Sequence, residues 1–179
     1  MPILDPILEK LGRAQRDFLC AADGVPAEQW KVTEGDGSWC AAQLVAHLIA
    51  VERSVISQAD RILQHPPRQV PFLKRLHLPL TLVEKRLIRR KTPIPLDLQL
   101  IREKEDMLAE LRHVRERTLA FIEETRGRNL SQYRWRHPFL GSFNLYGWLA
   151  FIGSHQLRHG KQMRKIVAAL PKAIYHLQK

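Results

Sequence analysis

Three histidines have spacings that suit metal binding: His47, His155 and His159. His155 and His159 lie four residues apart in a helical pattern, so they share one helix face, because a turn takes 3.6 residues. His47 lies near the start of another helical pattern. A third imidazole from a facing helix would complete a three-nitrogen site with an open coordination position. Spacing alone leaves the alternative open, which is a set of hydrogen-bonded histidines in a partly polar core.

Other side chains near these histidines have ordinary structural interpretations. Glu52 lies about 140° round the helix from His47, so we expect a surface or interhelix ion pair rather than a ligand. The weaker alternative is that Glu52 supports the metal ligands without binding the ion. Trp148 suits the core. His137, before Pro138, suits a turn, although it could also line the mouth of a pocket. The remaining histidines stand in basic or loop surroundings and are expected at the surface: His65, His77, His113 and His176. No residue identifies itself as a general base.

The histidines belong to a chain with four long helical patterns, in which apolar residues recur every three or four positions. These patterns run from Ile3 to Leu19, from about Cys40 to Gln64, from about Leu96 to Arg126 and from about Asn144 to Leu170. No stretch alternates apolar and polar residues for long enough to indicate a sheet. We therefore predict an all-α four-helix bundle that forms a single domain over residues 1–179.

The connections predict the order of the helices. About 30 residues separate the second and third patterns, and they include six prolines between Pro66 and Pro95. Antiparallel neighbours need only short loops, whereas parallel neighbours need a crossover. Helices 2 and 3 should therefore run the same way, in an up-down-down-up bundle with a long, proline-rich, basic crossover. Thr81–Lys91 could form a short extra helix within it.

The chain has a formal net charge of +11 at pH 7, and much of it lies in this crossover. Residues 61–95 hold nine Lys or Arg side chains and one acid, Glu84. Such a run is usually a solvated face, but it could form an anion-binding rim over a metal pocket or a nucleic-acid contact. The segment has one aromatic residue, Phe72, so it lacks stacking platforms for bases. Nucleic-acid binding is therefore the weaker interpretation.

The sequence gives no sign of a membrane or secreted protein. The longest apolar runs are broken by polar residues and are too short to cross a bilayer. The first residues, Met1 to Pro6, lack the basic region and apolar block of a signal peptide. Cys20 and Cys40 provide no disulfide framework and fit reduced thiols. We expect a cytoplasmic protein.

Two stretches of the chain resemble a known family. Residues 26–52 run from Pro-Ala-Glu-Gln-Trp through Gly-Ser-Trp-Cys-Ala-Ala-Gln to His47 and Glu52. They are similar to the entry into the second helix of the DinB-like (YfiT-like) superfamily. Residues 137–163, from His-Pro-Phe-Leu-Gly through Trp148 to the H-x-x-x-H pair, resemble that family's last loop and helix. In architecture, the likeness covers nearly the whole chain.

The resemblance implies a four-helix bundle with a divalent metal held by one histidine of the second helix and two of the fourth. Matched by position, these ligands are His47, His155 and His159. Imidazole suits Zn2+ or Ni2+, and Fe2+ fits the same ligands. Studied relatives include thiol-dependent transferases, a maleylpyruvate isomerase and proteins assigned as metal hydrolases. The family also implies a homodimer.

One position departs from the family pattern. The family usually has Ser or Thr after the tryptophan, where it caps the second helix, whereas this chain has Cys40 after Trp39. A thiol is a poor N-cap, so we expect Ser38 or Asp36 to cap the helix instead. This departure affects the start of the helix and leaves the three histidines in place.

The expected function follows from a cation bound by neutral imidazoles, which leave the ion its full charge. Such an ion lowers the pKa of a bound thiol or water. The sequence therefore favours a metal-dependent enzyme for a small molecule, either a transferase that uses a low-molecular-weight thiol or a hydrolase. The thiol route rests on the resemblance alone. The alternatives are a non-catalytic metal-binding or interaction bundle and, more weakly, a nucleic-acid-binding protein that uses residues 61–95.

Overall fold

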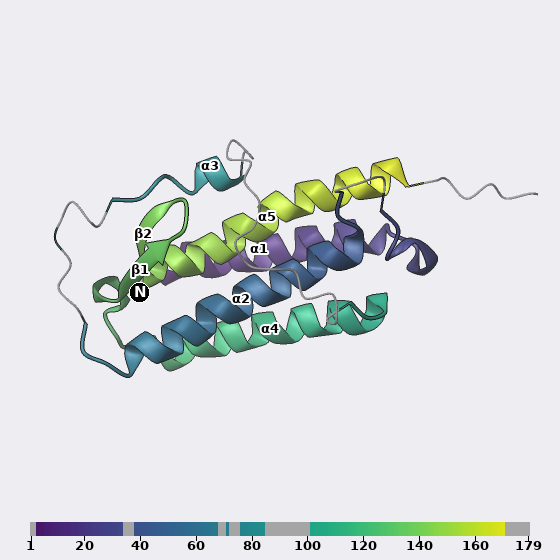
Figure 1. The fold of residues 1–179 in the computed structure, drawn as a ribbon. Coiled ribbons are helices and arrows are strands. Elements are labelled where there is room, and N and C mark those ends of the chain that lie inside the picture. Colours follow the sequence, from purple (N-terminus) through teal and green to yellow (C-terminus); the bar gives the residue numbers. More distant parts are fainter. Residues whose placement is uncertain (1–2, 34–37, 68–70, 72–75, 85–100, 171–179) are drawn as a thin grey trace, which may run out of the picture.

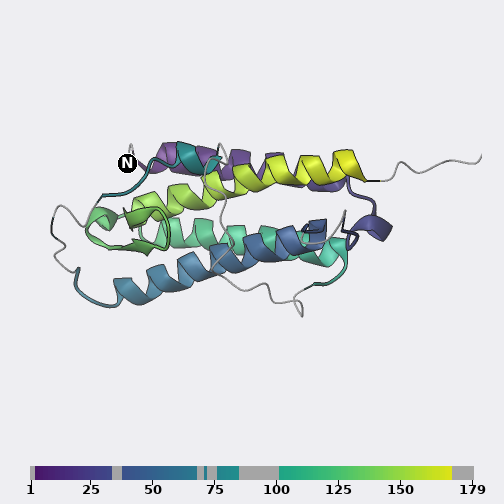
Figure 2. The ribbon, with the colours of Figure 1, turned by 45° about the horizontal axis from the view of Figure 1, so that its top comes forward.

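The computed structural model describes residues 3–33, 38–67, 71, 76–84 and 101–170. These residues are mostly helical, as predicted. The long helices are α1 (Leu4–Asp23), α2 (Ala41–Leu63), α4 (Lys104–Glu124) and α5 (Leu145–Ala169). The short elements are α3 (Thr81–Glu84), two 3-10 helices at Ala27–Gln29 and Leu130–Gln132, and the strands β1 (Arg134–His137) and β2 (Gly141–Asn144). Two views show α1 alongside α5 and α2 alongside α4 (Figures 1 and 2).

The apolar core has two parts, and each long helix contributes to both. The hairpin-side core contains residues near β1 and β2, and the far core lies toward the start of α2. Members of the hairpin-side core include Leu11, Val55, Phe121 and Leu149, and members of the far core include Phe18, Leu44, Leu111 and Met163. On α1 the buried residues recur every three or four positions and share one face, whereas consecutive residues are buried over 44–49 of α2 and 151–154 of α5.

The start of α2 differs from the prediction. Cys40 caps the helix: its Sγ accepts a hydrogen bond from the Gln43 N–H at 3.5 Å, and Oε1 of Gln43 accepts one from the Cys40 N–H at 3.0 Å. This reciprocal pair is a capping box in which sulfur replaces a hydroxyl. The expectation that Ser38 or Asp36 caps the helix is wrong, because the Gln43 side chain supports the weak thiol acceptor. Asp36 itself lies outside the described residues.

A β-hairpin that the sequence did not predict precedes α5. β1 pairs antiparallel with β2, and Asn144 then caps α5 by accepting a hydrogen bond from the Gly147 N–H at 2.8 Å. Gly141 has a φ of 92°, and a Cβ there would collide with the Leu76 carbonyl oxygen. Only glycine therefore lets Leu76 and His77 lie against the hairpin. The hairpin and its cap fix where α5 begins.

The connection between α2 and α4 is described only in part. Residues 85–100 lie outside the described residues, as does every Lys or Arg of residues 61–95 except Arg61. The predicted short helix is present at Thr81–Glu84, and its remainder falls in the undescribed part. The third long helix begins later than expected, at Lys104, and Ile101 is not helical. None of the described helices has the length and apolar character needed to cross a bilayer.

Candidate metal centre

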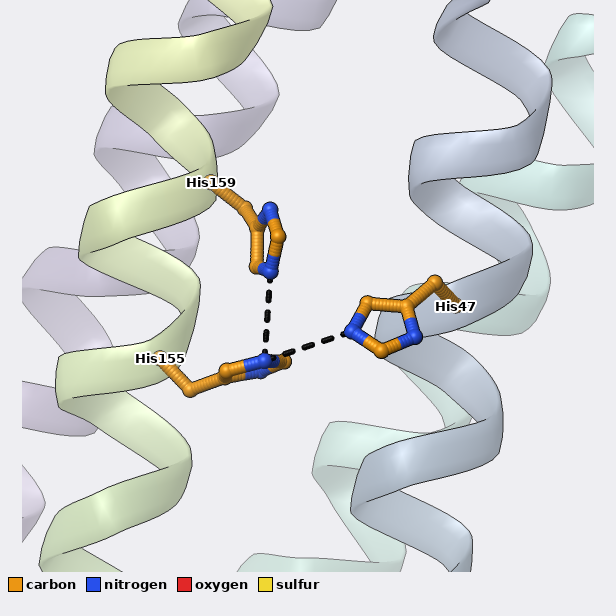
Figure 3. Close-up of side chains that lie close together, drawn as sticks. All are labelled: His47, His155 and His159. Carbon is orange, nitrogen blue, oxygen red and sulfur yellow. Dashed lines mark hydrogen bonds between the residues drawn. The ribbon is translucent and has the colours of Figure 1, made fainter. Parts of the chain in front are cut away.

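Three histidine side chains from two helices converge between α2 and α5 (Figure 3). Nε2 of His155 lies 3.3 Å from Nε2 of His47 and 3.1 Å from Nε2 of His159. His47 and His159 are buried, and His155 is half-buried. The structure thus brings together the three histidines that the sequence singled out.

The distances between these nitrogens suit a shared cation. Two nitrogens that bind one zinc ion at about 2.0–2.1 Å lie roughly 3.3 Å apart at a tetrahedral angle. Hydrogen bonds alone satisfy the cluster poorly, because an Nε2 atom carries either one hydrogen or one lone pair. Nε2 of His155 nevertheless faces two other nitrogens. The ligand atoms of the three residues lie within 4.8 Å of one another, so the cluster could hold a metal ion.

Burial keeps two of the rings in the neutral form that metal binding requires. It lowers the pKa of His47 from its ordinary value of 6.5 to about 4, and the positive charge of Arg158 adds to the effect. Burial also holds the pKa of His155 well below 6.5, and the neighbouring histidines add to the effect. A neutral imidazole offers its lone pair to a cation without first releasing a proton. Both rings are therefore ready to bind a cation at neutral pH.

Gln162 orients the ring of His159. Its Oε1 lies 3.1 Å from Nδ1 of His159, one helical turn away. Because an amide oxygen accepts hydrogen bonds, Nδ1 of His159 carries the hydrogen and Nε2 keeps its lone pair. Histidines that bind metals commonly donate their second N–H in this way, which fixes both the tautomer and the ring orientation. Helical spacing puts Gln162 and His159 on one face, but it gives no sign of this hydrogen bond.

Aromatic side chains flank the three histidines. Trp39 meets the ring of His47 edge-on, with centroids 5.0 Å apart, and Phe151 stacks on His155 at 5.2 Å. Trp148 is buried and packs against Phe151 at 5.5 Å, so its predicted place in the core is confirmed. Trp39 and Phe151 thus cover one side of the His47 and His155 rings, and electrostatic interactions are stronger where water is excluded.

His137 ends β1 and extends this aromatic group. Its Nδ1 accepts hydrogen bonds from the N–H groups of Phe139 and Leu140, at 3.1 and 3.3 Å, which confirms the predicted turn role. Burial lowers its pKa to about 4. The ring lies 4.9 Å from that of Phe151. No local sequence signal indicates this contact, because it depends on the unpredicted hairpin. A place at a pocket mouth stays a prediction.

The other residues considered from the sequence are not members of the histidine cluster. Glu52 forms a buried ion pair with Arg115 of α4, 2.7 Å between Oε1 and Nε, so the interhelix interpretation is confirmed and the surface one is wrong. Arg115 had no predicted role, and no local sequence signal marks it as buried. Three of the remaining histidines are exposed as expected: His65, His77 and His113. His176 lies outside the described residues.

Comparison with known families agrees with the site. The family model described as the DinB superfamily matches residues 10–163, which include all three histidines. The chain belongs to the DinB superfamily. The family match therefore covers most of this DinB-superfamily protein, and it includes both stretches in which the resemblance was seen. No curated protein matches the chain.

Proposed function

We propose that His47, His155 and His159 bind one divalent cation and that this DinB-superfamily protein is a metal-dependent enzyme. The observation that carries the proposal is the convergence of three Nε2 atoms, with neighbouring pairs 3.1 and 3.3 Å apart. Lowered pKa values support it, because protons do not compete for His47 and His155 at neutral pH. Zn2+ and Ni2+ are the ions that this ligand set favours, and Fe2+ is the third candidate.

Each residue of the centre would have a distinct role in the reaction. When bound, the ion would supply Lewis acidity, which lowers the pKa of a thiol or water in an open coordination position. His47 and His155 contribute lone pairs and no negative charge, so they leave this acidity undiminished. Gln162 holds His159 in the tautomer that directs Nε2 to the same point. Trp39 and Phe151 exclude water beside the reacting groups.

Transfer of a low-molecular-weight thiol to a small electrophile is the first reaction we propose, and hydrolysis is the second. A thiolate attacks an electrophilic carbon without further activation, and the leaving group departs with the bonding electrons. Hydrolysis commonly uses a general base as well. Among the described residues, the cluster that could hold a metal consists of histidines only and includes no carboxylate. The thiol route also agrees with the activities that the resemblance implies.

The order of the helices, the oligomeric state and the cellular location are also part of the proposal. We propose an up-down-down-up four-helix bundle, a homodimer and a place in the cytoplasm. Figure 1 supports the helix order, because α1 and α5 begin at one end of the molecule and α2 and α4 begin at the other.

Turnover by the metal-loaded and metal-free protein tests the proposed function. The protein is loaded with Zn2+ or Ni2+ and incubated with a small thiol and a chloronitrobenzene electrophile, and separately with an activated ester. We expect metal-dependent consumption of the thiol by the wild type and none by His155→Ala. Metal binding without turnover of either substrate would contradict the enzyme and favour the non-catalytic metal-binding bundle. His113→Ala, a change at an exposed histidine, is the matched control.

A further inference from the structure

A buried group of polar side chains joins all four long helices. Arg115 of α4 donates from Nε and Nη2 to the two carboxylate oxygens of Glu52 on α2, at 2.7 and 2.9 Å. Nη2 also donates to Oε1 of Gln156 on α5 at 2.9 Å, and Nη1 donates to the Leu11 carbonyl oxygen on α1 at 2.6 Å. Thr118 of α4 donates to Glu52 at 2.7 Å. We call the four side chains Glu52, Arg115, Thr118 and Gln156 the Arg115 network.

The Arg115 network lies where the apolar core divides. On α4, Val114 belongs to the far core and Phe121 to the hairpin-side core, and the network residues lie between them. On α2, the far core reaches Ile49, and the hairpin-side core includes Val51 and Val55. On α5, the two cores are separated by the stretch from Ile152 to Met163. Directional hydrogen bonds therefore add to the apolar contacts that hold the helices at this level.

The histidines lie near the network along both α2 and α5. Glu52 follows His47 by five residues, about 7.5 Å along α2. Gln156 directly follows His155 on α5. The two helices that supply the candidate ligands are thus both held by the guanidinium of Arg115, close to those ligands. Arg115 also contacts α1, which packs alongside α5.

A gain in folding stability is a weak explanation for burying the Arg115 network. All four residues are at most 4% exposed, and removing an ion pair from water costs much of what the pairing returns. Apolar residues of similar volume often stabilise such a position equally well. Hydrogen bonds differ from apolar contacts in being directional, so they fix where one helix lies along and around another. A metal centre needs such accuracy, because ligands must be held to within about 0.5 Å.

We propose that Arg115 is a positioning residue for the metal centre. By holding Glu52 and Gln156 together, it sets α2 against α5 and so places Nε2 of His47 against the two nitrogens of α5. The inference rests on the proposed metal site. Its consequence is that the network controls metal affinity more strongly than it controls folding.

Replacement of the network by apolar residues separates these two effects. The triple variant E52L/R115M/Q156M removes both charges, and the Thr118 hydroxyl keeps an acceptor in the Val114 carbonyl oxygen, 3.2 Å away. We expect an unfolding midpoint no lower than that of the wild type. The Kd for Zn2+, measured by competition with a chelating dye, should rise at least about tenfold, the loss typical of groups that orient metal ligands. The control D60N/R117Q removes an exposed ion pair between the same two helices, α2 and α4, and should change neither quantity.

A second variant keeps the test sharp if the triple variant fails to fold. Gln156→Met breaks only the link to α5 and leaves the pair of Glu52 and Arg115 intact, and we expect a folded protein with weaker Zn2+ binding. An unchanged Kd in a folded triple variant or in Gln156→Met overturns the inference and leaves the metal site standing. A wild type that binds no Zn2+ contradicts the proposed function itself, and the inference then falls with it.

Discussion

The metal-free protein should lose stability as the pH falls from 6.5 toward 4, and His47 should account for a measurable share of the loss. Burial lowers the pKa of His47 to about 4 in the folded chain, and unfolding returns it to 6.5. Between these values the unfolded chain binds a proton that the folded chain does not, so acid favours unfolding. Well above pH 6.5 the ring is neutral in both states and adds almost no pH dependence.

The size of the effect follows from the two pKa values. At pH 4.5 the proton bound by the unfolded chain lowers the free energy of unfolding by about 2.5 kcal/mol relative to pH 7.5. A small domain is typically stable by about 5–15 kcal/mol, so this share is easily measured. His155 acts in the same direction, because its pKa is lowered as well.

Urea unfolding of chelator-treated protein at pH 7.5 and 4.5 measures the share due to His47. His47→Gln removes the proton-binding group, so the wild type should lose about 2.5 kcal/mol more than this variant between the two pH values. His113→Gln, at an exposed site, should lose as much as the wild type. Equal losses in the wild type and in His47→Gln would refute the argument from burial.

Three further predictions concern the centre and the hairpin. His155→Ala should raise the Kd for Zn2+ by about 100-fold or more, because losing a ligand weakens binding more than losing a group that orients a ligand. The control His113→Ala should leave the Kd unchanged, and calorimetric titration measures both. Gln162→Leu should raise the same Kd by about 10–100-fold, and an unchanged Kd would show that Gln162 does not orient His159. Gly141→Ala should lower the free energy of unfolding by about 2 kcal/mol or more, since its φ of 92° and the nearby Leu76 carbonyl exclude a Cβ. A loss below about 0.5 kcal/mol in urea would argue against that strain.

The long helices could be predicted because in each one apolar residues recur every three or four positions. The fourth pattern predicted a helix from about Asn144 to Leu170, and α5 spans Leu145–Ala169. The start of α4 was predicted too early, because the apolar spacing continues through Ile101, where the chain is not helical. Apolar spacing shows which residues could share a face, but it does not show where the helical hydrogen bonds begin.

The hairpin could not be predicted from local pattern. Its strands have four residues each, too few for an alternation of apolar and polar residues to stand out. The contact of Leu76 with Gly141 joins residues far apart in sequence, so no local rule describes it. The sequence could therefore place His137 in a turn without showing that its ring meets Phe151.

The three histidines of the candidate site could be predicted, but the side chains that support them could not. Spacing puts His155 and His159 on one face, and the family resemblance adds His47. Neither shows which buried groups support these helices. Arg115 lies in a charged stretch of α4 and has the local pattern of a surface residue. Its burial depends on Glu52, from a separate helix, and the sequence does not show that the two meet.

The metal content of the purified protein tests the central claim most directly. The wild type and a variant that replaces His47, His155 and His159 with alanine are dialysed together against Zn2+ or Ni2+ and then against buffer, and both are measured by elemental analysis. The account predicts about one divalent ion per wild-type chain and almost none per variant chain. Equal metal content in the two proteins, or no metal in the wild type, would contradict it.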